Sequence, residues 1–270
     1  PKGEIYRTTA AALREQGYNV RLLNFRDYRH SECWNPMTPI FRKYAQIDKV
    51  YDEVEVVKDG GKYKNRFHGI VYDSQPELDE ALNTEINMLK EDVYNDVDIL
   101  AGMVIETQST KDPTWEDNAR EVFKAFIFAM LEDSELDDGE PNKITEDTFS
   151  FNTILRVMST FSDSSSFEDQ GYFSRRGENS KALAATKTLL LQNAPVTRRG
   201  IMSTLSAKIS VLRESTIRLI TSCNTFEFEE VVEKPTVIFI DYRDEVKAHY
   251  RMISLFVQDA YRFLIEKANS

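Results

Sequence analysis

The strongest helical pattern in the chain covers residues 112–133, DPTWEDNAREVFKAFIFAMLED. Asp112 is a residue type that caps helices, and Pro113 suits a first helical turn. Apolar side chains recur three and four positions apart, at Trp115, Ala119, Val122, Phe123, Phe126, Ile127, Met130 and Leu131. Phe128 and Ala129 widen this apolar face, as is typical of a helix inside a bundle. We therefore predict that this helix is the central element of a helical domain.

The same spacing predicts further helices on both sides of the central one. Ser74 and Glu77 have the pattern of a capping box, which opens a helix reaching to about Glu106. Ser180 is expected to cap another helix, which Pro195 ends. The remaining helices predicted for this block are residues 148–161 and residues 197–222.

Both ends of the chain carry apolar runs that are typical of buried strands. Residues 5–16 predict a short helix closed by Gly17, and residues 18–25 predict a strand after it. The loop of residues 26–39 is expected to be extended. Residues 235–241, PTVIFID, predict a parallel-type strand that leads into a final helix. The inner face of that helix is expected to carry Ile253, Phe256, Val257, Ala260, Tyr261 and Leu264.

A short segment before the helical block has strand character. Residues 50–57 alternate between apolar and acidic side chains, and residues 67–72 form a second strand-like run. Because Asp59 and two glycines lie between them, we predict a surface β-hairpin. His68 is expected at the solvent edge of its second arm.

These patterns together predict a mainly α fold, a helical bundle inserted between α/β pieces at the two ends of the chain. Residues 1–45 and 231–270 are assigned to the α/β part. Residues 46–73 are assigned to the hairpin insertion, and residues 74–230 to the all-α domain.

Composition is that of a globular protein, with 41% apolar and 29% charged residues among 270. The formal net charge of −11 argues against a protein that coats nucleic acid with its whole surface. Two cysteines, Cys33 and Cys223, are too few for a disulfide framework, and each is expected to be a small buried apolar residue. No apolar run is long enough to cross a bilayer.

Charge is unevenly distributed in the second half of the chain. Residues 132–147 contain eight carboxylates and one lysine, which predicts a solvated loop. Residues 171–220 contain nine cations, opposed only by Glu178 and Glu214. Such a stretch could bind phosphates, or it could be a solvated helix face or meet an acidic subunit. The candidates for DNA or partner binding are Arg175, Arg176, Lys181, Lys187, Arg198, Arg199 and Lys208; Arg213 and Arg218 complete the stretch.

Motifs of independent catalysis are missing from the sequence. There is no G-x-x-x-x-G-K-[ST] phosphate loop, and residues 237–241 only imitate a Walker B strand. His30, His68 and His249 do not have the spacing of metal ligands, and no G-x-S-x-G elbow is present. We predict neither a catalytic nor a metal site in this chain.

The order of these pieces resembles the cytoplasmic part of TraG-type coupling proteins, the membrane-bound ATPases of conjugative type IV secretion systems. The resemblance rests on PKGE at residues 1–4, followed by two threonines and a glycine, and on S-x-x-W-N-P at residues 31–36. It also rests on PTW at residues 113–115, which opens the long apolar helix. The last segments are the strand KPTVIFI at residues 234–240 and the helix at residues 249–264.

The resemblance implies that the α/β pieces are an incomplete RecA-like nucleotide-binding domain. It places the family's P-loop just before Pro1 and its Walker B motif shortly after Ser270, so this chain alone should be inactive, while ATP and Mg²⁺ belong to the parent protein. The residues that match the motifs of the nucleotide domain are Lys2, Gly3, Glu4, Asn35 and Pro36.

The resemblance further implies a hexameric parent at the cytoplasmic face of the membrane, with membrane contact through segments outside this chain. Its partners would be DNA, a relaxase or relaxosome proteins, and components of the secretion channel. The all-α domain would recognise the DNA or its processing proteins. The alternatives are a scaffold that docks only proteins and a self-contained α/β ATPase or nuclease. The hairpin around Gly60 and the helix after Ser74 are larger than the family pattern leads us to expect, and the resemblance does not account for the acidic loop.

Overall fold

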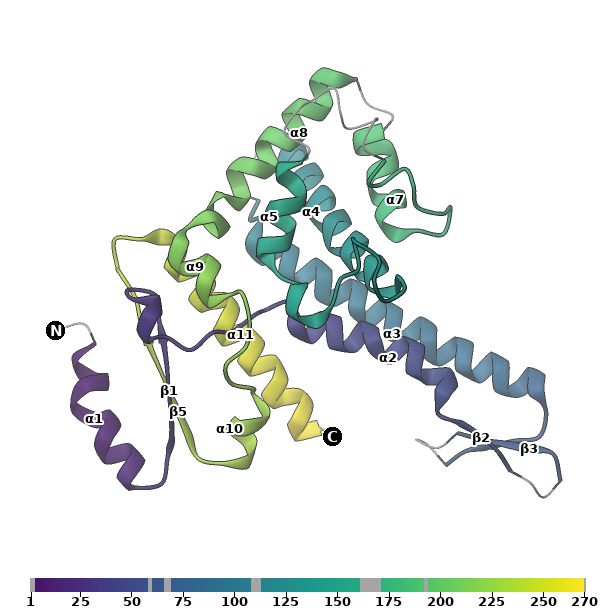
Figure 1. Ribbon diagram of the computed structural model, residues 1–270, viewed down its shortest axis with the longest axis horizontal. Coiled ribbons are helices and arrows are strands. Elements are labelled where there is room, and N and C mark those ends of the chain that lie inside the picture. Colours follow the sequence, from purple (N-terminus) through teal and green to yellow (C-terminus); the bar gives the residue numbers. More distant parts are fainter. Residues whose placement is uncertain are drawn as a thin grey trace. The chain divides into compact units, whose positions relative to one another are not determined.

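The computed structural model describes residues 3–57, 60–65, 69–107, 113–160, 171–191 and 194–269. The described chain is mainly α-helical and contains two small sheets, as predicted (Figure 1). It divides into two compact units, one made of residues 1–37 with 100–270 and the other of residues 38–99. None of the described helices is long and apolar enough to cross a membrane.

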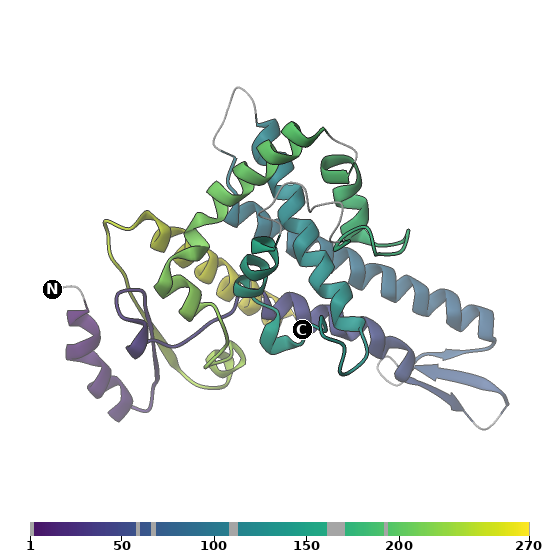
Figure 2. The ribbon, with the colours of Figure 1, turned by 45° about the horizontal axis from the view of Figure 1, so that its top comes forward.

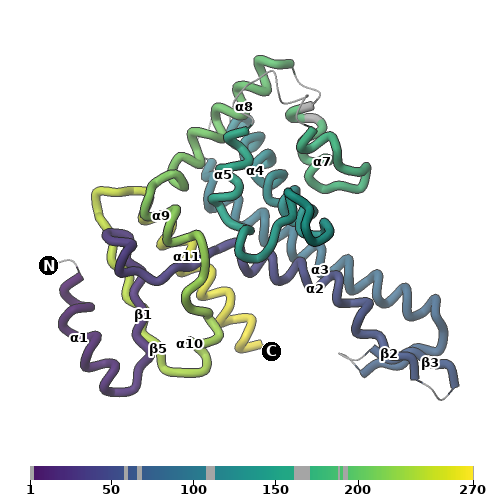
Figure 3. Tube along the Cα trace, viewed as in Figure 1, coloured from purple at the N-terminus to yellow at the C-terminus, as the bar shows by residue number. Residues whose placement is uncertain are grey.

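The strands predicted near the two ends of the chain pair in one sheet of the larger unit. β1 (Asn19–Asn24) runs parallel to β5 (Thr236–Asp241), with Val20 opposite Val237 and Leu23 opposite Ile240. Figure 3 shows the late β5 segment returning alongside the early β1 segment. The two predicted strands and the parallel type predicted for residues 235–241 are therefore confirmed, and the structure adds that they pair with each other.

Two helices flank this pair of strands on opposite sides (Figures 1 and 2). α1 (Glu4–Glu15) packs through Tyr6, whose ring meets Phe239 edge-on at 5.4 Å. Gly17, with φ of +87°, follows α1 in the left-handed conformation that glycine adopts without strain. On the other side, α11 (Lys247–Asn269) places the ring of Phe256 5.1 Å from that of Trp34.

The predicted inner face of α11 is wrong beyond Phe256. The buried residues of this helix are His249, Met252, Leu255 and Phe256. Val257, Tyr261 and Leu264 are 53%, 64% and 43% exposed. A helix of 23 residues extends over about 35 Å, whereas a six-residue strand covers about 20 Å, so the sheet cannot cover the whole helix.

The loop after β1 is not fully extended as predicted, because it contains the 3₁₀ turn η1 (Tyr28–His30). Its second half is fixed by neighbouring segments: the backbone N–H of Trp34 donates to the carbonyl of Ile220 at 2.7 Å. The expectation of two buried cysteines is also wrong. Cys33 in this loop is half-buried and Cys223 is exposed, since both lie in connections rather than in the core.

The predicted central helix is α4 (Thr114–Glu132), and it lies inside a bundle with α5 (Phe151–Ser159), α7 (Lys181–Thr186) and α8 (Pro195–Lys208). Most of its residues are buried: Ala119, Val122, Phe123, Ala125, Phe126, Ile127, Phe128, Ala129, Met130 and Leu131. Trp115 in its first turn is 42% exposed, contrary to its assignment to the apolar face. Asp112, the predicted cap, lies outside the described residues.

Two helix boundaries in the basic stretch differ from the prediction. Ser180 does cap α7, accepting from the N–H of Leu183, but Pro195 opens α8 instead of ending the preceding helix. A π-helical segment, Lys187–Leu191, follows α7. The predicted helix of residues 197–222 is divided into α8, the 3₁₀ helix η5 (Ile209–Arg213) and α9 (Ser215–Ile220). Glu214 causes the break, because its backbone is extended and its side chain caps α9.

The remaining elements of the larger unit are short. η2 (Asp133–Glu135) and η3 (Glu146–Thr148) lie in the acidic loop, and α10 (Glu229–Glu233) precedes β5. The prediction of a solvated loop is wrong at its start, where Asp133 is only 4% exposed. Asp133 can be buried because Arg175 and Arg176, which are distant in sequence, form ion pairs with it.

The smaller unit contains α2 (Thr38–Asp52), a three-stranded antiparallel sheet and most of α3 (Gln75–Val104). The strands are β2 (Val54–Val57), β3 (Lys62–Asn65) and β4 (Val71–Tyr72). The hairpin prediction was wrong in register: residues 50–52 belong to α2, and β2 pairs with residues 62–65 rather than 67–72. Asp59 and His68 lie outside the described residues. Val50, Leu78 and Leu82 form the apolar core of this unit.

Candidate nucleic-acid interface

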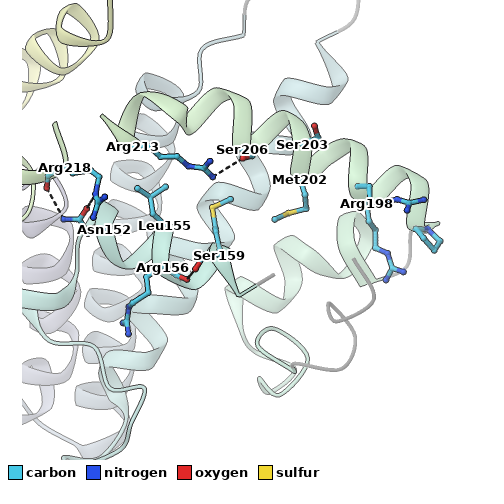
Figure 4. Close-up of a pocket in the computed structure, with 13 residues that line it drawn as sticks. Asn152, Leu155, Arg156, Ser159, Arg198, Met202, Ser203, Ser206, Arg213 and Arg218 are labelled. Carbon is cyan, nitrogen blue, oxygen red and sulfur yellow. Dashed lines mark hydrogen bonds between the residues drawn. The ribbon is translucent and has the colours of Figure 1, made fainter. Parts of the chain in front are cut away.

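A pocket of about 810 Å³ opens between α5, α8, η5 and α9 of the larger unit (Figure 4). Its volume lies in the range that small-molecule and nucleotide sites occupy. The lining contains five arginines and no aspartate or glutamate. The residues are Asn152, Leu155, Arg156, Met158, Ser159, Pro195, Arg198, Arg199, Met202, Ser203, Ser206, Arg213 and Arg218. We call these five arginines and the space they surround the arginine pocket.

The arginines come from four different elements. Arg156 belongs to α5, Arg198 and Arg199 to the first turns of α8, Arg213 ends η5, and Arg218 lies on α9. Figure 4 shows Arg218 at one end of the pocket and Arg198 toward the other. The break at Glu214 that separates η5 from α9 is therefore part of what brings these side chains around one space.

Two of the arginines donate hydrogen bonds to neutral side chains. Arg213 donates to the hydroxyl of Ser206 at 3.0 Å, and Arg218 donates to the side-chain oxygen of Asn152 at 3.3 Å. In the part of the chain that the structure describes, Arg156, Arg199, Arg213 and Arg218 form no ion pair with a carboxylate. Neutral partners orient a guanidinium without cancelling its charge, so the pocket keeps a local positive potential.

Glu214 is the acid next to Arg213 in the sequence, and it is engaged elsewhere. Its carboxylate accepts a hydrogen bond from the backbone N–H of Ile217 at 2.8 Å. This contact caps α9 and favours the negative charge at the positive end of the helix.

One wall of the arginine pocket is apolar. Leu155 and Met158 of α5 and Met202 of α8 supply it, and Figure 4 shows the Leu155 and Met202 side chains between the polar residues. An apolar wall beside guanidinium groups is complementary to a ligand that carries both anionic and flat apolar parts. A single nucleic-acid strand has this chemistry.

The structure separates the other predicted binding residues from the pocket. The side chain of Arg176 is 7% exposed and forms ion pairs with Asp133 at 2.9 Å and Glu132 at 3.0 Å. Arg175 pairs with Asp133 at 3.2 Å, and both guanidinium groups lie over the ring of Tyr172. Burial raises the pKa of Tyr172 well above its usual value. This cluster fastens residues 171–177 to the end of α4.

Of the remaining lysines, Lys208 forms an ion pair with Glu116 and donates to the carbonyl of Glu106 at 3.2 Å. Lys181 and Lys187 are exposed on α7 and at the start of the π-helical segment, and neither lines the pocket. From the predicted set, the pocket therefore collects only Arg198 and Arg199.

Three of the pocket arginines were not selected from the sequence. Arg213 and Arg218 were counted in the basic stretch but not named as binding residues, and Arg156 lies outside that stretch. The sequence of α8 did indicate a polar face, because Arg199, Ser203 and Ser206 follow one another at helical spacing.

The residues assigned to the nucleotide-domain motif fall into two places, and Lys2 lies outside the described residues. Gly3 is the N-cap residue directly before α1 and has φ of +84°, and a Cβ there would lie 2.8 Å from a carboxylate oxygen of Asp241. Glu4 is exposed as the first residue of α1. Asn35 and Pro36 are buried, and the side-chain amide of Asn35 donates to the carbonyl of Phe149 at 2.8 Å.

A cavity of about 290 Å³ adjoins Gly3 at the carboxyl ends of β1 and β5, and Asn35 and Pro36 do not line it. Asp241 lies there in an ion pair with Arg26 at 2.8 Å. This pair gives Asp241 a structural partner at the end of its strand.

A family model described as type IV secretory system conjugative DNA transfer matches residues 1–270. No curated protein matches the chain.

Proposed function

Since the chain belongs to the type IV secretory system conjugative DNA transfer family, we propose that its helical bundle recognises the transferred DNA through the arginine pocket. Participation in conjugative DNA transfer follows from the family. What we propose beyond the family is the direct ligand of this chain, which we assign as the sugar–phosphate backbone of a single DNA strand.

One observation carries the proposal: five arginines surround one open space whose lining has no carboxylate. A guanidinium group donates two parallel hydrogen bonds to a phosphate and keeps its charge at every physiological pH. The apolar wall of Leu155, Met158 and Met202 suits the sugar and base faces of an unpaired strand.

Charge reversal tests this proposal. The double variant Arg198→Glu with Arg199→Glu should weaken binding of a fluorescently labelled single-stranded oligonucleotide by about tenfold or more, because it replaces two attractive contacts by repulsive ones. Fluorescence anisotropy at low salt measures the dissociation constant. Circular dichroism of the variant verifies that the helices are intact.

The matched control is the double variant Arg7→Glu with Lys49→Glu. Both residues are exposed on other helices, and the change in net charge is the same. This control should lower affinity only slightly, through the overall charge. Equal losses in both double variants would show that the pocket has no special role and would favour a bundle that docks only proteins.

We also propose that residues 1–45 and 231–270 belong to a RecA-like domain of a hexameric ATPase at the cytoplasmic face of the membrane. The parallel pairing of β1 with β5, with a helix on each side, supports this assignment. ATP and Mg²⁺ would bind mainly to segments outside this chain, because the sequence contains no phosphate loop. A titration of this chain with a fluorescent ATP analogue should show no saturable binding; saturable binding would favour a self-contained ATPase.

DNA-processing proteins such as a relaxase, and components of the secretion channel, are the protein partners that this function requires. A relaxase that presents DNA at the arginine pocket would compete with free oligonucleotide for the same arginines. Loss of oligonucleotide binding with retained relaxase binding in the Arg198→Glu, Arg199→Glu variant would assign the two partners to different surfaces.

A further inference from the structure

The two cysteines of the chain are brought together from distant parts of the sequence. Cys33 lies in the loop after β1, and Cys223 lies just after α9. Backbone hydrogen bonds join these loops on both sides of the cysteines. The N–H of Trp34 donates to the carbonyl of Ile220 at 2.7 Å, and the N–H of Thr225 donates to the carbonyl of Cys33 at 3.0 Å.

Side-chain contacts complete this junction. The backbone N–H of Cys33 donates to the hydroxyl of Thr225 at 2.8 Å. The Cys33 thiol lies 3.5 Å from the carbonyl of Leu219, and the nearby Cys223 contributes to the raised pKa of Cys33. Since Cys223 is exposed and Cys33 is half-buried, a small molecule can reach the pair from solvent.

We propose that Cys33 and Cys223 are a redox-sensitive dithiol, which a small-molecule disulfide such as glutathione disulfide converts into an intramolecular disulfide bond. The bond would join the loop that follows β1 to the loop that follows α9. It would thereby fix these two loops of the larger unit in one arrangement relative to each other. This inference is independent of DNA binding.

The reaction balances in two exchange steps. The Cys223 thiolate attacks one sulfur of glutathione disulfide, its S–S bond breaks, and one glutathione leaves and takes up the proton lost from Cys223. The Cys33 thiolate then attacks the sulfur of Cys223 and displaces the second glutathione, which takes up the proton of Cys33. Two protein thiols are oxidised, and one glutathione disulfide is reduced to two glutathione molecules.

The order of the steps follows from the surroundings of each thiol. Burial, together with the neighbouring Cys223 and Glu32, raises the pKa of Cys33 to about 12. Exposed Cys223 should therefore react first, and closure by Cys33 should be the slow step. Because the thiolate is the nucleophile, the rate of closure should increase about tenfold for each pH unit below the pKa of Cys33.

The test treats the purified chain with glutathione disulfide at several pH values, followed by acid quenching, alkylation and mass spectrometry. The expected product is a monomer about 2 Da lighter than the reduced protein, without bound glutathione. Peptide mapping should find the peptides of Cys33 and Cys223 linked to each other. The midpoint of thermal unfolding should be higher than that of the reduced protein and return to the original value with dithiothreitol.

Two single variants test the role of each cysteine. Cys33→Ser should retain glutathione on Cys223, an adduct of about 305 Da, because nothing displaces it. Cys223→Ser should react slowly and show no increase in the unfolding midpoint. A wild-type protein that keeps the Cys223 adduct at high pH, or that forms only dimers linked between chains, would overturn the proposal.

Discussion

At the scale of single residues, Asp133 organises the charges at the end of α4. Its carboxylate accepts hydrogen bonds from Arg175, Arg176 and the hydroxyl of Tyr172. The side chains of Asp133 and Arg176 are 6% and 7% exposed, so their attraction is little screened by water. Arg176 therefore stabilises the bundle through this ion pair, and its charge is compensated within the domain.

Removing the Asp133 carboxylate should destabilise the bundle strongly. Asp133→Ala leaves the buried guanidinium of Arg176 with an incomplete set of partners, and breaking a buried pair in this way costs about 3–5 kcal/mol. Urea denaturation followed by circular dichroism measures the change in the free energy of unfolding. The control Asp138→Ala removes a carboxylate that is 97% exposed in its ion pair with Lys143 and should leave the unfolding midpoint unchanged. Equal stabilities of the two variants would contradict the role given to Asp133.

His249 should make stability depend on pH. Burial lowers the pKa of His249 below its ordinary value of 6.5, and its Nδ1 accepts a hydrogen bond from the N–H of Arg243 at 3.2 Å. The unfolded chain therefore binds a proton more readily than the folded one. The His249 contribution to the free energy of unfolding is complete above pH 6.5 and is lost as the pH falls from there toward the folded pKa.

The variant His249→Gln keeps an acceptor for Arg243 but cannot titrate. Its free energy of unfolding should change less between about pH 7 and pH 5 than that of the wild type. Chemical denaturation at each pH measures this difference. Parallel pH profiles for the two proteins would exclude His249 as a cause of the dependence.

At the scale of elements, the position of α8 against α4 depends on a glycine. A Cβ on Gly200 would lie 2.6 Å from the ring of Trp115, closer than two carbon atoms can approach. Gly200 follows Arg198 and Arg199 directly, so this close packing also sets where α8 carries its pocket arginines. The half-exposed Trp115 therefore covers a helix surface that has no side chain of its own.

Alanine substitutions at two helical glycines separate the effect of packing on stability from the effect of helix propensity. Gly102 of α3 has open space around its Cα, so Gly102→Ala should stabilise the protein by up to about 1 kcal/mol. Gly200→Ala should lack this gain and should shift the tryptophan fluorescence, because the Trp115 ring must move. A Gly200→Ala protein with wild-type fluorescence and the same gain in stability would contradict the proposed contact.

The sequence predicted some of these helices and strands and missed others. Apolar runs identified β1 and β5, and the helical period identified α4, because each pattern reports burial of a whole element. α2 was missed because its last residues, 50–52, also fit the alternation of the following strand. The sequence analysis missed the interruption of the helix predicted for residues 197–222. Glutamate is common in helices, and only the structure shows that the side chain of Glu214 caps α9.

The candidate site was predictable to the same limited extent. Local charge density was sufficient to select Arg198 and Arg199. It could not separate them from Arg175 and Arg176, because the difference lies in Asp133, which is distant in sequence and pairs with both. Arg156 reaches the pocket only through the packing of α5 beside η5.

At the scale of the whole molecule, the arginine pocket is a cationic site in a chain of net charge −11. An acidic surface repels a polyanion in general, whereas a local cationic site attracts it at one place. This distribution favours selective contact of DNA with the bundle over binding across the whole surface. The DNA binding that we propose should also be sensitive to salt, because each phosphate contact releases condensed counterions.

The dependence of single-stranded DNA affinity on salt tests the central claim most directly. The association constant is measured by fluorescence anisotropy over a series of salt concentrations, for the wild type and for Arg198→Gln with Arg199→Gln. If both arginines contact phosphates, the slope of log K against log salt should be less steep in the variant by about 1.4, since each contact on a single strand contributes about 0.7. Identical slopes and affinities for the two proteins would contradict the claim that the arginine pocket binds DNA.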